Sequence, residues 1–456
     1  MFTRTTFTRR LTSARGLACA SAALATLAAT ASLAGVTASA AQAQPLPPGQ
    51  DPFYTYTGAT PLSAIAPGTV LKTREESYHV LGVSLPVQVV QLLYRSTTET
   101  GSPTVNVTSV LEPPAGATSS SGPANVVAYQ SFYDSLNPDD EPSYAISGGV
   151  SLDPSIPNVE SALIAPELLS GDAVVIADTE GEQADFAAGP EYGMLTLDSL
   201  RAALASPATD LAASTKIGLI GYSGGAIATE WAAEIAPSYA PQLNKLIVGA
   251  SFGGVLVDPD HNLHYINGSV LWAGVMPMAL IGISRAFGID LTPYMSAYGQ
   301  ELFSQMQNDS ITQVLGEYPG LTWSQIAKPQ YQEPEQIPVF VKLANQLIMG
   351  EHGTPTEPLL IAQGADGTIE GSNGFQPGIG PGDGVMIAGD VRTLAREYCS
   401  RGVAVQYDEY DALDHVGTAA PWITTTVPWL AARFAGLPAP KDCGQIAPGN
   451  VVAPIG

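Results

Sequence analysis

The sequence contains one serine in a setting that can make it a nucleophile. Ser223 is the centre of a Gly-x-Ser-x-Gly motif, with Gly221 two residues before it and Gly225 two residues after it. A hydrophobic run, 216–221, leads into the motif, and a run of small residues follows it. Such a serine lies on a tight turn between a strand and a helix, where the helix N-terminus favours developing negative charge. We therefore interpret Ser223 as a nucleophile for acyl transfer.

A serine hydroxyl attacks a carbonyl group only when a base removes its proton, so one of the five histidines has to act as that base. In proteins with this kind of turn, the histidine lies in a loop after the last strand, near the C-terminus. His415 is the histidine in that position, because it follows the predicted strand 403–410. We expect His415 to be the general base.

The acid that orients the histidine should follow the preceding predicted strand, 359–363, and two aspartates do so. Asp366 comes first and is favoured by its distance from the strand alone. Asp383 comes after the Gly/Pro-rich segment 367–382 and directly before a predicted helix. If that segment is a loop insertion, Asp383 is the acid, so the residues alone leave both candidates open.

Two other histidines, His261 and His264, lie among aspartates in the segment 258–264. Aspartate and histidine side chains can bind a metal ion together. We interpret them as loop residues rather than as a metal cluster, and the chemistry predicted for Ser223 requires neither a metal nor a cofactor.

The elements that must position these residues alternate along the chain. Short hydrophobic runs are separated by helix-like stretches such as 193–204, 226–235 and 427–434. This alternation predicts an α/β fold with a largely parallel sheet covered by helices on both faces. The predicted strands are 87–94, 104–111, 124–130, 173–177, 216–221, 246–250, 359–363 and 403–410.

One segment, 254–337, has helical patterns but no convincing strand, and we interpret it as an inserted helical cap or lid. Its uncharged run 270–283 is 14 residues long, which is too short to cross a bilayer. The run is predicted to form either a buried helix interrupted at Pro277 or an apolar lid over a lipid-binding cleft. The catalytic domain would then comprise 71–253 and 338–456.

Composition excludes several classes of protein. The chain has 456 residues, of which 45% are hydrophobic, so it can bury a large core and is not a disordered or fibrous protein. It has 18 Lys and Arg against 42 Asp and Glu, a formal net charge of −24, and no basic run. A nucleic-acid partner is therefore not expected.

The N-terminal residues 1–43 have the three parts of a secretory signal peptide: four arginines, an Ala/Leu-rich run, and small-residue triplets that allow cleavage near Ala40 or Ala43. A membrane anchor is the alternative interpretation. The pair Arg9 and Arg10 is compatible with twin-arginine export. Cleavage would leave a secreted chain with no transmembrane segment, beginning with an exposed lead-in, 44–70.

Cleavage would also leave two cysteines, Cys399 and Cys443. An even count in an exported protein predicts a disulfide, here one that joins the C-terminal tail to the body of the protein.

Four stretches together resemble the lipase-A-like secretory lipase family, over nearly the whole chain after residue 43. They are Gly221-Tyr222-Ser223-Gly224-Gly225, Tyr133-Asp134-Ser135, Asp178-Thr179-Glu180-Gly181, and the stretch from Asp383 past Cys399 to His415. The resemblance implies an α/β-hydrolase fold and Asp383 as the acid. It also implies an oxyanion hole formed by the backbone N–H groups of Asp134 and Gly224.

The resemblance and the residues together predict a secreted serine carboxylic-ester hydrolase, most similar to a triacylglycerol lipase. Its substrate would be a lipid or another apolar ester, bound at a lipid–water interface. A serine peptidase or an acyltransferase would use the same three side chains, so both remain alternatives. The remaining alternative is an inactive binding protein of the cell envelope that keeps the fold.

Overall fold

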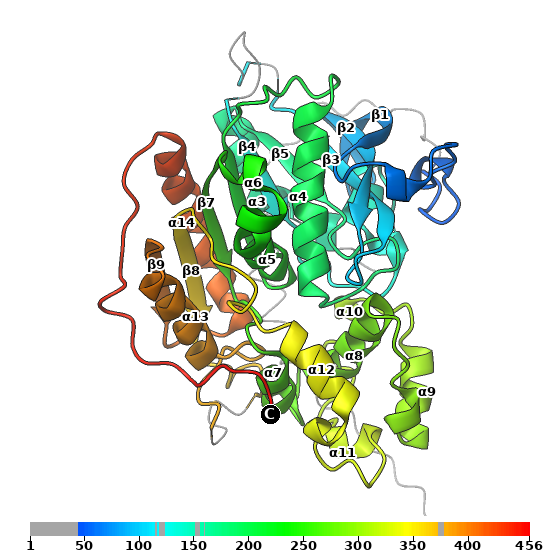
Figure 1. The fold of residues 1–456 in the computed structure, drawn as a ribbon, viewed down its shortest axis with the longest axis vertical. Helices are drawn as coiled ribbons and strands as arrows, with labels where there is room; N and C mark the ends of the chain where they lie inside the picture. Colours follow the sequence, from blue (N-terminus) through cyan, green and yellow to red (C-terminus); the bar gives the residue numbers. More distant parts are fainter. Residues whose placement is uncertain (1–43, 115, 118–123, 151–155, 159, 373–377) are drawn as a thin grey trace, which may run out of the picture. The chain divides into compact units, whose positions relative to one another are not determined.

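The computed structural model describes residues 44–456 except for 115, 118–123, 151–155, 159 and 373–377. The predicted signal peptide lies outside the described residues. A nine-stranded sheet, with strand order β1-β2-β3-β5-β4-β6-β7-β8-β9, forms the centre of the fold (Figure 1). The strands are β1 (Val70–Val80), β2 (Val83–Thr97), β3 (Pro103–Leu111), β4 (Val126–Gln130), β5 (Ala173–Ala177), β6 (Ile217–Tyr222), β7 (Ile247–Gly253), β8 (Leu359–Gly364) and β9 (Val405–Tyr410).

The sheet is antiparallel at one edge and parallel elsewhere. The pairs β1–β2, β2–β3 and β3–β5 are antiparallel, whereas the five pairs from β5–β4 to β8–β9 are parallel. Every residue of β4, β5 and β6 is buried, which explains why these strands are continuous hydrophobic runs. The prediction of a largely parallel α/β sheet is confirmed.

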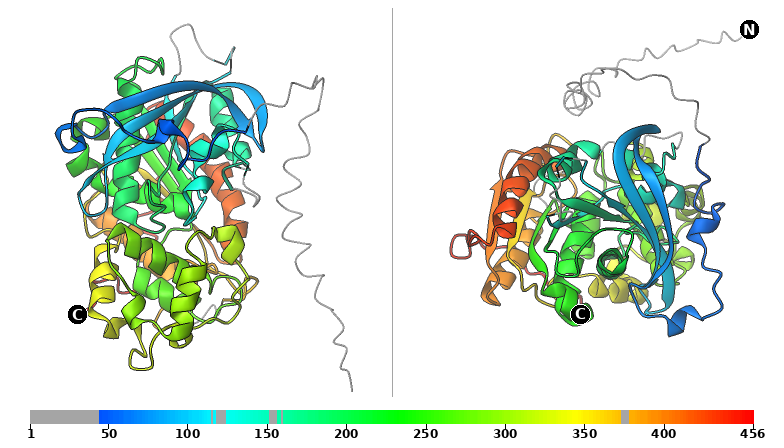
Figure 2. Two further views of the ribbon diagram at one scale, coloured as in Figure 1. Left: turned by 90° about the vertical axis from the view of Figure 1, so that its right-hand side faces the viewer. Right: turned by 90° about the horizontal axis from the view of Figure 1, so that it is seen from above.

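Strand β1 was not predicted. It is rich in charged and polar residues and only two of its eleven residues are buried, so it carries no continuous hydrophobic run. It pairs with β2 in a long hairpin that curls over the edge of the sheet (Figure 2). Pairing with a mostly buried partner, rather than its own composition, makes this segment a strand.

Helices cover both faces of the sheet. Residues of α4 (Gly189–Ala205), α5 (Gly224–Tyr239) and α13 (Ala388–Ser400) share one hydrophobic cluster with the strands. A second cluster contains residues of α2 (Pro142–Ile146), α3 (Ser161–Ser170) and α14 (His415–Phe434). The short helix α6 (Pro241–Asn244) leads into β7.

Helix α14 is much longer than the predicted helix 427–434, because it begins at His415. Two prolines, Pro421 and Pro428, lie inside it, and prolines normally indicate a helix boundary. Packing of Trp422 and Trp429 against the sheet, within the second cluster, keeps the segment helical.

Between β7 and β8 the chain forms a helical segment, 254–346, with a hydrophobic cluster of its own. It lies at one end of the sheet, drawn in green and yellow in Figures 1 and 2. Its helices are α7 (Pro259–Ile266), α8 (Val275–Ala286), α9 (Ala297–Gln305), α10 (Ile311–Val314), α11 (Trp323–Ile326) and α12 (Pro338–Gln346).

Two expectations about the helical segment are corrected. Pro277 does not interrupt a helix: it is the third residue of α8, where the backbone N–H groups have no partner within the helix. His261 and His264 lie on helix α7 and not in a loop, because Asp258 caps the helix N-terminus and Pro259 occupies its first position.

Single turns of 3₁₀-helix complete the described chain, at η1 (Pro52–Tyr54), η2 (Leu62–Ala64), η3 (Pro138–Asp140), η4 (Ile156–Asn158), η5 (Thr292–Tyr294) and η6 (Pro334–Gln336). A disulfide joins Cys399, in α13, to Cys443 in the C-terminal tail. Within the described residues, no helix has the length and hydrophobicity needed to span a bilayer.

Candidate active site

Ser223 lies on the tight turn between β6 and α5, as the motif predicts. Its backbone is left-handed, with φ 54° and ψ −121°, a strained conformation that is common at functional sites. A Cβ atom on Gly221 would lie 2.1 Å from the carbonyl oxygen of Gly225, and one on Gly225 would lie 2.1 Å from that of Gln130. The motif glycines are therefore required by the close approach of strand, turn and helix.

His415 contacts Ser223 from the first residue of α14. Its Nε2 lies 2.8 Å from the Ser223 hydroxyl oxygen, and its Nδ1 lies 2.9 Å from a carboxylate oxygen of Asp383. The backbone N–H of His415 donates to the Asp383 carbonyl oxygen at 2.7 Å, and the Tyr222 hydroxyl donates to the His415 carbonyl oxygen at 2.5 Å. The imidazole is thus held in one orientation between the serine and the aspartate.

Asp383 is completely buried, and each of its carboxylate oxygens has partners. One oxygen accepts from the backbone N–H groups of Val385 and Met386, at 3.1 and 2.7 Å. The other accepts from the Gln363 amide at 2.9 Å, in addition to its contact with His415. These donors take the place of water around the buried carboxylate group.

Asp366 does not contact His415. Its carboxylate accepts from the backbone N–H and the hydroxyl of Thr368, and these hydrogen bonds lower its pKa. The structure therefore brings Asp383, and not Asp366, to the histidine.

Opposing influences act on the pKa of His415. Burial is the largest and lowers it, but the carboxylates of Asp383, Glu370 and Asp134 together raise the pKa above its ordinary value of 6.5. A histidine held between an aspartate and a serine is able to accept the serine proton and to be stabilised when charged.

Asp134 and Gly224, the expected oxyanion-hole residues, lie together beside the serine. A Cβ atom on Gly224 would lie 1.6 Å from a carboxylate oxygen of Asp134. Asp134 has a left-handed backbone, with φ 37°, and its carbonyl oxygen accepts from the backbone N–H of Ile311 at 2.7 Å. Burial raises the pKa of its carboxyl to about 7. Both residues line the same cavity as Ser223.

The motif at 178–181 supports this loop. The Glu180 carboxylate accepts from the backbone N–H of Ser135 and from the Tyr192 hydroxyl. Its own backbone N–H donates to the Tyr133 hydroxyl at 2.8 Å. Glu180 therefore fixes the residues on both sides of Asp134.

A cavity of ≈ 90 Å³ begins at Ser223 and continues into the helical segment. Helices α7 and α8 supply much of its wall and α12 adds Phe340, and nearly all of the lining side chains are apolar, including Leu263, Met276 and Ile283. Such a cavity suits an aliphatic or other apolar group placed next to the nucleophile.

Two residues near His415 were not identified from the sequence. The Trp272 and His415 rings form a T-shaped contact, with ring centroids 5.2 Å apart, and the indole N–H of Trp272 donates to the Glu370 carboxylate. Burial raises the pKa of Glu370 to about 7, and its other oxygen accepts from the backbone N–H of Val416. No local motif marks either residue, because Trp272 lies in the helical segment and Glu370 in the inserted loop.

Comparisons with known proteins agree with this architecture. A family model described as "Secretory lipase" matches residues 150–442. Lipase 4 of Candida albicans is 29% identical over 414 residues, which cover 88% of this chain and 85% of that protein. A Mycobacterium tuberculosis protein named "Probable inactive lipase MT1628" is 31% identical over 405 residues, covering 87% and 84%. Among solved structures, Candida antarctica lipase A in its closed state is similar with a TM-score of 0.74 and 26% identity, covering 90% and 91% of the two chains.

The fold is that of the α/β-hydrolases. The chain belongs to the secretory lipase family, which confirms the resemblance seen in the motifs and places the protein among the carboxylic-ester hydrolases.

Proposed function

We propose that the protein is a secreted lipase that hydrolyses esters of apolar acyl chains through an acyl-serine intermediate. The observation that carries the proposal is the series of hydrogen bonds from Ser223 through His415 to Asp383, in which Ser223 lines the apolar cavity. In that series the Nδ1–H of His415 donates to Asp383, which leaves Nε2 free to accept the serine proton.

Ser223 attacks the ester carbonyl carbon while His415 takes its proton. The oxyanion that forms is stabilised by the backbone N–H groups of Gly224 and Asp134. The proton on His415 passes to the leaving alcohol, and the acyl group remains on the serine. Water activated by His415 then releases the carboxylic acid by the same steps and restores the serine hydroxyl.

The domain boundaries follow from this proposal. Residues 71–253 and 338–456 carry the catalytic groups, and 254–337 form a cap that supplies much of the apolar wall of the cavity, to which Phe340 of α12 adds. Residues 1–43 are the signal peptide, cleaved near Ala40 or Ala43, and the substrate is bound at a lipid–water interface. The family description as secretory supports export.

The experiment that tests the proposal measures hydrolysis of p-nitrophenyl esters from acetate to palmitate by the wild type and by Ser223→Ala. We expect wild-type activity to be highest on long chains and the variant to lose it, with an unchanged circular dichroism spectrum. The variant should also fail to react with a fluorophosphonate probe that labels the wild type. Equal turnover in the two proteins would refute the mechanism.

A catalytically inactive protein is the second candidate, because one relative is named an inactive lipase. The intact contacts of Ser223, His415 and Asp383 favour the active enzyme. A folded wild type that neither hydrolyses any ester nor reacts with the probe would favour the inactive protein. Probe labelling without ester hydrolysis would favour a peptidase or an acyltransferase.

A further inference from the structure

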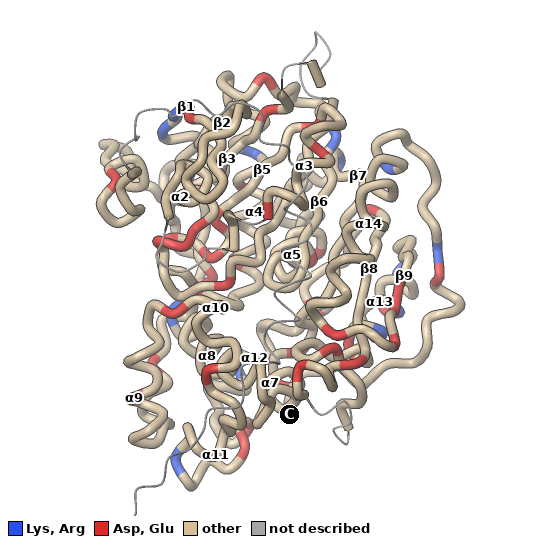
Figure 3. The backbone as a smooth tube through the Cα atoms, turned by 180° about the vertical axis from the view of Figure 1, so that it is seen from behind, with Lys and Arg blue, Asp and Glu red and all other residues tan. Residues whose placement is uncertain are grey.

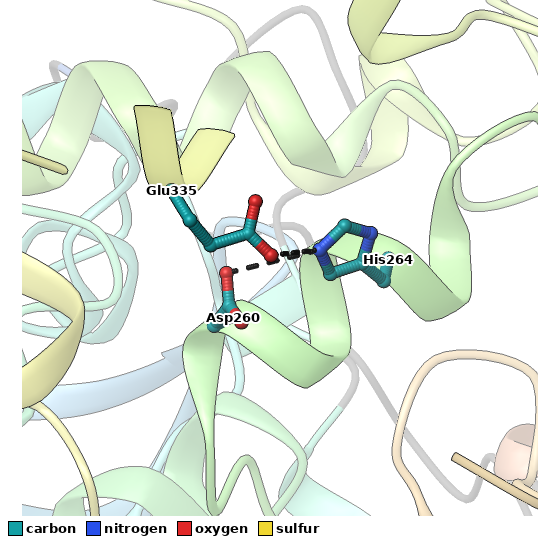
Figure 4. A group of neighbouring side chains, drawn as sticks. All are labelled: Asp260, His264 and Glu335. Carbon is teal, nitrogen blue, oxygen red and sulfur yellow. Dashed lines mark hydrogen bonds and ion pairs between the residues drawn. The ribbon is translucent and has the colours of Figure 1, made fainter. Parts of the chain in front are cut away.

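Three side chains of the helical segment, none of which lines the cavity at Ser223, converge: Asp260 and His264 from α7, and Glu335 from η6 (Figure 4). One ligand-type atom from each lies within 4.8 Å of the other two. His264 Nε2 is 2.7 Å from a carboxylate oxygen of Glu335 and 3.9 Å from Oδ1 of Asp260. We propose that this group binds a divalent transition-metal ion, with zinc as the ion that fits best.

The chemical types of the three side chains suit a zinc ion. One imidazole and two carboxylates are the kind of three-ligand set that holds zinc, with water as the fourth ligand. Asp260 and His264 are four residues apart on one helix, so they project from the same face. Glu335 approaches that face from a separate element.

The distances from His264 to the two carboxylates are close to those between the ligands of a zinc ion. Three ligands at tetrahedral positions about 2.0 Å from a zinc ion are about 3.3 Å apart. The His264–Glu335 pair would have to open by about 0.6 Å and the His264–Asp260 pair to close by about 0.6 Å, which small side-chain rotations supply. The proton on Nε2 would leave to solvent as the metal binds, so affinity should fall in acid.

Two buried carboxylate oxygens of this group have no hydrogen-bond partner. Asp260 is 8% exposed, and its Oδ1, which faces His264, has no hydrogen-bond partner. Oε2 of Glu335 is also buried without a partner. Buried acceptors left unpaired are costly, and a cation would satisfy both carboxylates.

The neighbouring His261 provides a contrast on the same helix. Its Nδ1 lies 3.0 Å from the carboxylate of Asp390 and forms a hydrogen bond with it. His261 is therefore paired with a carboxylate outside the proposed group. His264 and Glu335 pair with each other, and their side chains are 26% and 31% exposed, so an ion can reach them from solvent.

Metal binding would connect two parts of the cavity wall. Helix α7 contributes Asn262, Leu263 and Ile266 to the lining, and α12, which follows Glu335, contributes Phe340. A zinc ion held between α7 and η6 would fix these elements relative to each other. The proposed ion is structural, and it takes no part in the hydrolysis.

The test is zinc binding to the purified full chain without a histidine tag, after treatment with a chelator. Isothermal titration calorimetry with ZnCl₂ near neutral pH should give one site per chain. Zinc at a hundredfold excess over Kd should raise Tm by about 3 °C, and EDTA should reverse the rise. Replacement by Co²⁺ should give the visible absorption of a four-coordinate site.

His264→Gln and Glu335→Gln should each weaken zinc binding by roughly tenfold or more. His261→Gln, the matched control, should bind zinc as the wild type does. Glu335 is partly exposed, so its amide variant is expected to fold, and circular dichroism would verify this. Absence of zinc binding by the wild type would overturn the proposal, as would equal affinity in wild type and Glu335→Gln. Neither readout depends on ester hydrolysis.

Discussion

The two aspartates that follow β8 differ in burial. Asp383 is completely buried against His415, whereas Asp366 is bonded to Thr368 in an exposed turn. We expect Asp383→Asn to lower kcat for ester hydrolysis by about four orders of magnitude, because the amide favours the wrong imidazole tautomer and cannot stabilise its charged form. Asp366→Asn should leave kcat unchanged. Loss of activity in Asp366→Asn alone would move the acid to the earlier turn.

Glu370 is expected to shift the acidic limb of the pH profile, which the pKa of His415 sets. His415 acts as a base only when neutral, and its raised pKa means that kcat/KM should fall as the pH drops through a midpoint above 6.5. The Glu370 carboxylate contributes to that raised pKa. Glu370→Gln should therefore move the midpoint to lower pH, as measured from kcat/KM on a soluble ester.

Asp366→Asn is the matched control for this shift, because it removes a negative charge from the same loop at a partly exposed position that does not contact His415. An equal displacement in both variants would show a general charge effect. An unmoved midpoint in Glu370→Gln would show that Asp383 and Asp134 alone hold the histidine pKa.

At the scale of elements, the approach of β6 to α5 leaves no room for a side chain at Gly221. An added Cβ would lie 2.1 Å from the Gly225 carbonyl oxygen and 2.5 Å from the Thr229 hydroxyl. We expect Gly221→Ala to destabilise the protein by about 3 kcal/mol and to lower activity by displacing Ser223. Urea unfolding and ester hydrolysis would measure the two effects.

Gly49→Ala is the control, because no heavy atom lies within 4 Å of the added Cβ. Wild-type stability in Gly221→Ala would mean that the strand and helix can separate at the turn.

The elements also show what a local pattern can reveal. Strands that are buried on both faces, such as β5 and β6, were predictable because burial demands continuous hydrophobic runs. Strand β1 and the first half of α14 were not, because β1 is held by its pairing with β2 and α14 by its packing against strands far away in the sequence. Charges in β1 and prolines in α14 conflict with the local preference for the structure that forms.

For the whole molecule, buried acids predict that stability falls as the pH rises. Acidic positions are spread along the described chain and basic ones are few (Figure 3). Burial raises the pKa values of Glu99, Glu160 and Glu357 to about 7 and that of Glu191 to about 9. These folded-state values exceed the ordinary value of 4.5, so the stabilisation is present below that pH and is lost as the pH rises through the folded values.

Thermal unfolding should therefore show a lower Tm at about pH 8.5 than at about pH 5.5. Glu357→Gln should reduce this difference in Tm, because the amide never ionises. One oxygen of Glu357 has no hydrogen-bond partner, so replacing that oxygen removes no hydrogen bond. A Tm that increases over this range would mean that paired carboxylates, such as Glu409 with Arg392, outweigh the buried ones.

The sequence by itself determined the fold class, the position of Ser223 and the choice of His415. Each follows from a short pattern whose physical cause is local: tight packing at the strand–helix turn, burial of parallel strands, and the order of elements along the chain. The family resemblance implied Asp383 as the acid, whereas the residues alone left Asp366 open. The tertiary structure decided between the two aspartates, placed Trp272 and Glu370 beside His415, and brought Glu335 to His264. Those contacts join residues 32 to 143 positions apart, and sequence spacing carries no information about the path of the intervening chain.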